Sequence, residues 1–198
     1  MTVEHRRRAV LLPAALVLVT GLLGAGRALA AEGPAGKPGI ELAQVQVQRA
    51  DGDLVLDYTV RFELPHDVED ALGKGVAVVF VARAEVFRER WYWTDRSRAV
   101  AERRWRVSFQ PLTRRWRVTF DGLSQHYGSL QEALAVMKRG RQWRLMDNAP
   151  SNDERDHYVE FTFELDRNEL PRPMQIGLEG QSDWALSVFR RVPISLNR

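Results

Sequence analysis

Two tryptophans and a neighbouring arginine form the stretch of the chain whose residue types suit binding best. Trp91 and Trp93 are two residues apart, so both indoles lie on one face of an extended chain, and Arg90 precedes them. An indole beside a guanidinium suits a sugar, a lipid headgroup or the centre of a protein interface. The alternative is that both indoles plug the end of a β-sandwich while nearby arginines pair with acidic strands.

A second group of candidate binding residues consists of arginines that alternate with apolar residues. Arg104, Arg106, Arg115 and Arg117 are predicted to project from one face of a hairpin whose other face is aromatic, with Asp121 the only local carboxylate. Residues 83–146 carry 15 basic and 6 acidic residues, whereas the segments before and after are net acidic. Such a chain more often neutralises itself than binds a polyanion, so we expect no nucleic-acid partner. The alternation favours an exposed arginine face over a buried one.

Residues of the types used in catalysis are present without the spacing that catalysis needs. His66, His126 and His157 form no metal-binding pair, and no nucleophile elbow or phosphate-binding loop occurs. The acidic segment 147–156 lacks the ligand spacing of a calcium-binding EF-hand. We therefore expect no enzyme activity, no metal and no cofactor.

The first thirty residues resemble a secretory signal rather than part of the fold. Arginines at positions 6–8 precede an apolar run over residues 9–26, and Ala28-Leu29-Ala30 supplies the small residues that a signal peptidase reads. Residues 1–30 are therefore predicted to be a signal peptide, residues 31–39 a flexible linker and residues 40–198 a single domain. The chain has no cysteine, which fits a periplasmic protein that relies on its core. The alternative is an inner-membrane anchor, and we expect membrane contact only if the leader is retained.

The first part of the domain is predicted to be a hairpin followed by a central strand. Residues 43–50 and 53–64 flank Asp51-Gly52, a dipeptide that favours a two-residue turn, and this register sets Val47 opposite Leu56 and Ala43 opposite Val60. A short helix is expected after Pro65. Within residues 76–88 the even positions from Val76 to Val86 are all apolar, which predicts a central strand.

The second part is predicted to contain another hairpin, a helix and three more strands. After a polar turn at residues 95–98, residues 102–110 and 115–120 alternate so that Val107 lies opposite Val118. Ser129 and Glu132 indicate a helix N-terminus, with Lys138 and Arg139 in its last turn. Further strands are expected near residues 158–165, 174–179 and 183–192. The whole is mainly β, an antiparallel β-sandwich of about eight strands with one or two short helices; an incomplete β-barrel is the alternative.

Several short stretches, in order along the chain, resemble one family. They are Phe-Glu-Leu-Pro at 62–65, Arg-Trp-Tyr-Trp at 90–93, Leu-Pro-Arg-Pro at 170–173 and Asp-Trp-Ala-Leu-Ser at 183–187. The chain is similar over residues 40–194 to the domain of unknown function 4390 family. The resemblance implies exported proteobacterial proteins without an assigned activity, whose genes often lie beside a membrane-bound sensor kinase. It defines no catalytic or binding residues.

These observations favour a non-enzymatic periplasmic interaction or accessory module. The resemblance alone suggests a protein partner, the outer domain of a sensor kinase. The alternative function is a domain that binds a small ligand or an envelope glycan through Trp91 and Trp93.

Overall fold

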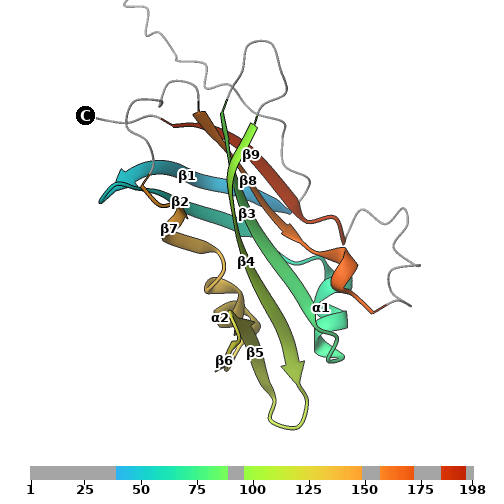
Figure 1. Cartoon of the computed structure of the whole chain (residues 1–198). Coiled ribbons are helices and arrows are strands. Elements are labelled where there is room, and N and C mark those ends of the chain that lie inside the picture. The colour runs from blue at the N-terminus through green and yellow to red at the C-terminus, as the bar shows by residue number, and fades with distance from the viewer. Residues whose placement is uncertain (1–38, 89–95, 149–156, 172–183, 195–198) are drawn as a thin grey trace, which may run out of the picture. The chain divides into compact units, whose positions relative to one another are not determined.

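The computed structural model describes residues 39–88, 96–148, 157–171 and 184–194 (Figure 1). Within these ranges the chain forms two antiparallel sheets. The three-stranded sheet has the order β1-β2-β7, and the six-stranded sheet has the order β6-β5-β4-β3-β8-β9. The prediction of a mainly β, antiparallel sandwich is confirmed, and the described strands do not close into a barrel. No helix in the described ranges is long and apolar enough to cross a membrane.

The elements follow one another in the order strand, strand, helix, four strands, helix, two strands, short helix and strand. Their bounds are β1 Ile40–Ala50, β2 Asp53–Phe62, α1 His66–Gly73, β3 Val78–Arg88, β4 Arg96–Gln110, β5 Arg115–Phe120, β6 Leu123–Tyr127, α2 Leu130–Ala135, β7 Arg139–Met146, β8 His157–Leu165, the 3-10 helix η2 Arg167–Glu169 and β9 Ser187–Pro193.

The first hairpin has the predicted turn and most of the predicted register. Asp51 and Gly52 both adopt positive φ, and Val47 lies opposite Leu56. The expected pairing of Ala43 with Val60 is wrong, because Val60 faces Leu42 and a β-bulge falls between Leu42 and Gln44. A bulge adds one residue to one strand, so hydrophobic alternation alone cannot place it.

Strand β3 lies between β4 and β8 and is the centre of the larger sheet, as predicted. Its even positions 78–86 are completely buried against the three-stranded sheet. On the other face Val79 and Val81 are also buried, whereas Arg83 is exposed. The strand is therefore covered on both faces at its start and on one face further along.

The second hairpin has the predicted pairing, and a third strand extends it. Val107 lies opposite Val118, and Phe109 lies opposite Trp116. Strand β4 already includes Arg96, so the expected polar turn at residues 95–98 is wrong for residues 96–98. Strand β6, which was not predicted, pairs with β5 through a turn at Asp121 and Gly122, both with positive φ.

The expected helix starts where predicted but ends early. Ser129 Oγ accepts a hydrogen bond from the amide of Glu132, whose carboxylate accepts one from the amide of Gly128. The helix ends at Ala135, and residues 139–146 form β7 instead of a helix end. Gly140 is buried against the ring of Tyr58, and a Cβ atom at this position would overlap that ring. This long-range contact makes the glycine part of a strand.

The C-terminal strands complete the core. In β8 the side chains of Val159, Phe161 and Phe163 are fully buried, as their alternation predicted. Trp184 and Leu186, just before β9, are also buried. The strand expected at residues 174–179 lies outside the described residues.

Candidate binding surface

The predicted binding residues fall into three groups. Arg90, Trp91 and Trp93 lie outside the described residues. Arg104 and Arg106 lie in the middle of the six-stranded sheet, on β4, and Arg115 and Arg117 lie on β5. The four described arginines share the face of the sheet that points away from the three-stranded sheet, because they alternate with the buried Trp105, Val107 and Val118.

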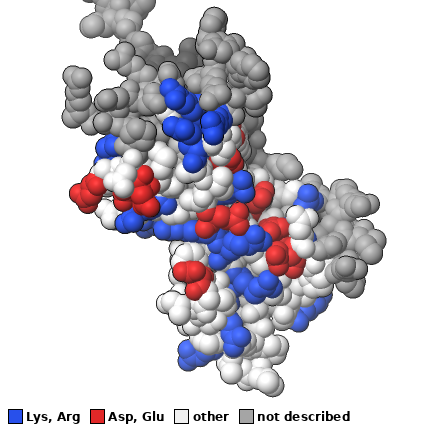
Figure 2. Space-filling model, viewed as in Figure 1, with Lys and Arg blue, Asp and Glu red and all other residues white. Residues whose placement is uncertain are grey.

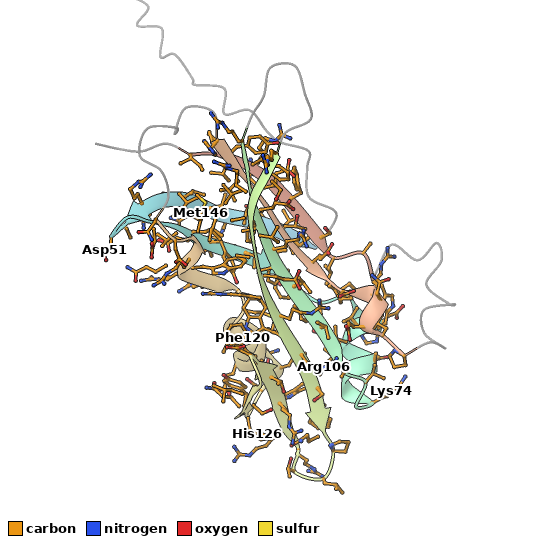
Figure 3. The ribbon with its side chains drawn as sticks, in the orientation of Figure 1. Asp51, Lys74, Arg106, Phe120, His126 and Met146 are labelled. Atoms are coloured by element: carbon orange, nitrogen blue, oxygen red, sulfur yellow. The ribbon has the colours of Figure 1, made fainter. Side chains whose placement is uncertain are left out.

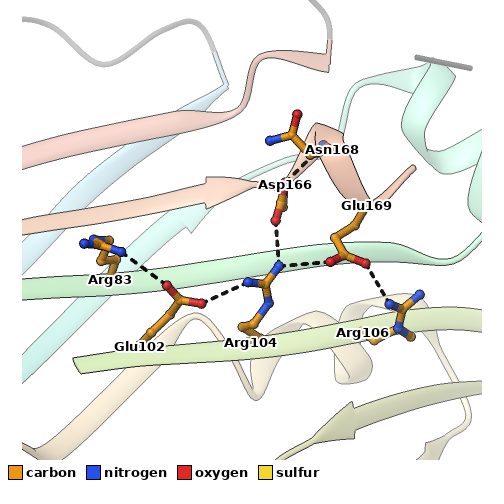
Figure 4. Close-up of polar contacts among 7 residues, drawn as sticks. All are labelled: Arg83, Glu102, Arg104, Arg106, Asp166, Asn168 and Glu169. Carbon is orange, nitrogen blue, oxygen red and sulfur yellow. Dashed lines mark hydrogen bonds and ion pairs between the residues drawn. The ribbon is translucent and has the colours of Figure 1, made fainter. Parts of the chain in front are cut away.

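Arg104 is tied to carboxylates from distant parts of the chain (Figure 4). Its Nη2 atom lies 2.7 Å from Oδ2 of Asp166 and 3.3 Å from Oε1 of Glu169, and its Nη1 atom lies 3.0 Å from Oε1 of Glu102. Arg106 lies 3.0 Å from the second oxygen of Glu169. The expectation that Asp121 would be the only local carboxylate is wrong, because Glu102, two residues from Arg104, contacts it. Its other two partners, Asp166 and Glu169, are more than 60 residues away in the sequence.

Arg83 extends this set of contacts across the sheet. It lies 3.6 Å from Glu102 and 3.1 Å from Glu85. A hydrogen bond from Ser97 and the nearby Arg83 hold the pKa of Glu85 below its usual value, against the effect of burial. The arginine–carboxylate network consists of Arg83, Arg104, Arg106, Glu85, Glu102, Asp166 and Glu169. Its three arginines and four carboxylates give it a formal charge of −1.

The segment that carries Asp166 is fixed to the sheet by its backbone. The amide of Asp166 donates to the carbonyl of Val79 on β3, and its side chain accepts from the amide of Asn168. Leu170, at the end of η2, is buried. The acidic side chains are thus held beside the arginines by a segment that is attached to the sheet through its backbone and through Leu170.

Arg115 and Arg117 are in a different electrostatic situation. Both are exposed, and neither has a carboxylate within ion-pair distance in the described part of the chain. With the Gln110 amide turned so that its oxygen accepts, that oxygen lies 2.6 and 3.0 Å from two nitrogens of Arg117. The amide nitrogen then lies 3.3 Å from Nε2 of His126. These polar contacts orient Arg117 without neutralising it.

We call Arg115, Arg117 and His126 the distal basic surface. Arg117 lies directly opposite His126 in the register of β5 and β6, and Arg115 is two residues from Arg117 on the same face. Figure 3 shows Arg106 and His126 on the part of the sheet formed by β4, β5 and β6. In Figure 2 acidic and basic residues are interleaved in the middle of the molecule, whereas the visible charged residues at the end with the β4–β5 hairpin are basic and lie among uncharged ones.

The other face of the same hairpin is an aromatic support. The rings of Trp105 and Phe120 stack with centroids 5.3 Å apart, and those of Phe109 and Trp116 lie 4.9 Å apart. Helix α2 packs against β5 and β6 on this face (Figure 1). Leu123 at the start of β6 is 73% exposed. The basic side chains therefore project from a packed sheet rather than from a loop.

One further arginine, Arg103, has a structural role. Its guanidinium lies 4.9 Å from the centroid of the Trp143 ring, and burial lowers its pKa. Burial also raises the pKa of Tyr58, whose hydroxyl donates to the carbonyl of Met137. Tyr58 lies in the core, and Arg103 is partly buried on the opposite face of β4 from Arg104, so both groups support the sheet from the side away from the binding surface.

The sequence did not indicate His126 as a binding residue, because a lone histidine carries no positional signal. The Asp121-Gly122 dipeptide is a signal that could have indicated His126, because a two-residue turn at this dipeptide sets Arg117 opposite His126. The described residues contain no group of three or more side chains of the types that bind metals.

Comparison with known proteins gives a family and nothing further. A family model described as a domain of unknown function, DUF4390, matches residues 37–193. No curated protein and no solved structure matches the chain. The match covers most of the chain, so the chain belongs to the DUF4390 family.

Proposed function

We propose that this member of the DUF4390 family is a non-enzymatic periplasmic interaction module that binds an acidic protein partner through the distal basic surface. The observation that carries the proposal is the contrast between two pairs of arginines. Arg104 and Arg106 are neutralised by Asp166 and Glu169, whereas Arg115 and Arg117 have no carboxylate partner in the described ranges.

Unneutralised arginines on a rigid sheet suit recognition of carboxylates. A guanidinium presents several donors in a planar fork and can bind a carboxylate through two parallel hydrogen bonds. Because Arg115 and Arg117 project from a packed strand, they lose less conformational freedom on binding than they would in a loop. Like-sign charge in one place also accelerates the encounter with an acidic surface.

The periplasmic location is supported by the leader over residues 1–30, and the partner class by the family. A sensor kinase whose outer domain carries an acidic patch is the partner we propose. The module would then act by occupying that domain rather than by changing it chemically.

The experiment is capture from the crosslinked bacterial envelope with three versions of the protein. The binding variant is Arg115→Gln with Arg117→Gln. The control is Arg139→Gln with Arg141→Gln, which removes the same charge from two exposed arginines of β7. The affinity of the captured partner is then measured with purified proteins at several salt concentrations.

We expect the binding variant to have an affinity for the partner at least about tenfold lower, and its affinity to change less with salt concentration. The control should bind like the unaltered protein. Equal affinity for all three versions would show that the distal basic surface is not the contact.

The alternative function, binding of a small ligand or glycan at Trp91 and Trp93, has one observation in its favour. Arg88 at the end of β3 lies directly opposite Arg96 at the start of β4, so positive charge borders the segment with the tryptophans. Quenching of tryptophan fluorescence by envelope oligosaccharides, lost in a Trp91→Ala and Trp93→Ala variant, would support this alternative.

A further inference from the structure

The outer edge of β6 is an open strand edge beside the distal basic surface. Strand β6 is the last strand of the six-stranded sheet and pairs only with β5 among the described strands. The two-residue turn makes Phe120 and Leu123 a hydrogen-bonded pair, so the backbone bonds to β5 come from Leu123, Gln125 and Tyr127. The amides and carbonyls of Ser124 and His126 therefore point outward.

The side chains of Ser124 and Thr119 agree with this assignment. Their hydroxyl oxygens are 2.9 Å apart, and directly opposed side chains lie closest in pairs that are not joined by backbone hydrogen bonds. Two amides and two carbonyls thus form a row at which another extended chain could continue the sheet.

The other three sheet edges carry features that discourage such pairing, and β6 does not. Charged side chains, proline and bulges protect strand edges in natural proteins. Strand β1 has a bulge, β7 has register shifts and three arginines, and β9 has two arginines and Pro193. Strand β6 has the sequence Leu-Ser-Gln-His-Tyr, in an unbroken register.

We propose that β6 binds an extended segment of the partner by strand addition, and that this segment alternates acidic and apolar residues. The inference rests on the proposed function for the partner's charge. Alternate side chains of an added strand would lie beside Ser124 and His126, on the face that carries Arg115 and Arg117. The remaining side chains would lie on the face where Leu123 is exposed.

Charge decides between this occupant and a second copy of the chain. If two β6 strands paired antiparallel, the two distal basic surfaces would lie on the same face of one continuous sheet. Like charges gathered in this way oppose association. An acidic segment instead gains contacts with both arginines.

The test uses fluorescein-labelled eight-residue peptides and fluorescence anisotropy with the full mature chain. One peptide alternates valine and glutamate, a second alternates valine and lysine, and a third is the valine–glutamate peptide with N-methyl groups on alternate amides. N-methylation removes the edge hydrogen bonds and leaves the side chains unchanged.

The protein variants separate backbone pairing from charge. Ser124→Pro removes an outward amide, and proline is tolerated in an edge strand when its nitrogen faces solvent. Ser124→Ala is the matched control, because it removes only the contact with Thr119. Thermal denaturation checks that both variants are folded.

We expect the valine–glutamate peptide to bind, and the lysine peptide and the N-methylated peptide to bind at least about tenfold more weakly. Ser124→Pro should weaken binding by about the same factor and Ser124→Ala should not. Failure of the valine–glutamate peptide to bind at millimolar concentration would overturn strand addition.

Two other outcomes separate this inference from the proposed function. If Arg115→Gln with Arg117→Gln weakens binding while N-methylation and Ser124→Pro do not, strand addition is wrong and the basic surface stands. If N-methylation abolishes binding while the arginine variant has no effect, strand addition stands and the proposed role of the arginines is wrong. A dimer in light scattering that Ser124→Pro dissociates would make a second copy the occupant and overturn the proposal.

Discussion

Replacing Arg104 by glutamine should destabilise the protein measurably, although the arginine is at the surface. Its side chain is 46% exposed, but that of Asp166, which it contacts at 2.7 Å, is only 16% exposed. After the substitution Glu102 keeps Arg83 and Glu169 keeps Arg106. Asp166 loses the only ion-pair partner that it has in the described part of the chain.

The size of the effect follows from the burial of Asp166. Exposed ion pairs contribute less than about 1 kcal/mol, whereas removing one partner of a fully buried pair costs about 3–5 kcal/mol. A pair with one well-exposed and one mostly buried member lies between these limits, at about 1–2 kcal/mol. For a chain of this length that corresponds to a fall of about 2–8 °C in melting temperature.

The assay is thermal and urea denaturation of the mature chain, with Arg117→Gln as the matched control. Arg117 is exposed and has no ion pair in the described ranges, so this variant should stay within about 0.5 kcal/mol of the unaltered protein. A double-mutant cycle of Arg104→Gln with Asp166→Asn should show a coupling above about 0.5 kcal/mol. Additive effects, or equal melting temperatures for the Arg104 and Arg117 variants, would refute the assignment of Arg104 to a structural network.

Three other predictions concern the core and the leader. Gly140→Ala should cost about 1–3 kcal/mol in urea denaturation because the new methyl group would displace the Tyr58 ring; a neutral effect would show that β7 can shift. Burial raises the pKa of Tyr58, so the unfolded chain loses this proton at about pH 10 while the folded chain keeps it, and stability should fall as the pH rises above that value. A Tyr58→Phe variant should show a shallower fall in melting temperature over the same range, and an unchanged slope would contradict the assignment. N-terminal sequencing of the periplasmic protein should begin at Ala31, whereas recovery from washed membranes with the leader attached would indicate an anchor.

The hairpins could be predicted from the sequence because their signals are local. Asp51-Gly52 fixes the register of its own hairpin, and the aromatic alternation around Val107 fixes that of the second. Strand β6 escaped prediction because Ser124, Gln125 and His126 are all polar, so the strand shows no alternation of apolar and polar residues.

Other features depend on contacts between distant residues. From the sequence alone, Gly140 is typical of a residue that follows the end of a helix. Its packing against the ring of Tyr58 becomes visible only in the structure. Similarly, the arginines at 104 and 106 could not be told from those at 115 and 117, since the difference is made by Asp166 and Glu169. The sequence therefore placed the four described arginines on one face, but it could not separate the two that form ion pairs from the two that form none in the described ranges.

The position of β3 between β4 and β8 has a consequence for how the protein folds. Strands β3 to β6 are consecutive in the sequence, and each pairs with the next. The other edge of β3 pairs with β8, where Phe80 lies opposite Leu165, and between these strands the chain contributes β7 to the other sheet. Pairings between residues so far apart form slowly. As the chain folds, the edge of β3, which is apolar on both faces at its start, therefore stays unpaired until β8 has formed. We expect this edge to be where folding intermediates aggregate and where a chaperone would bind them.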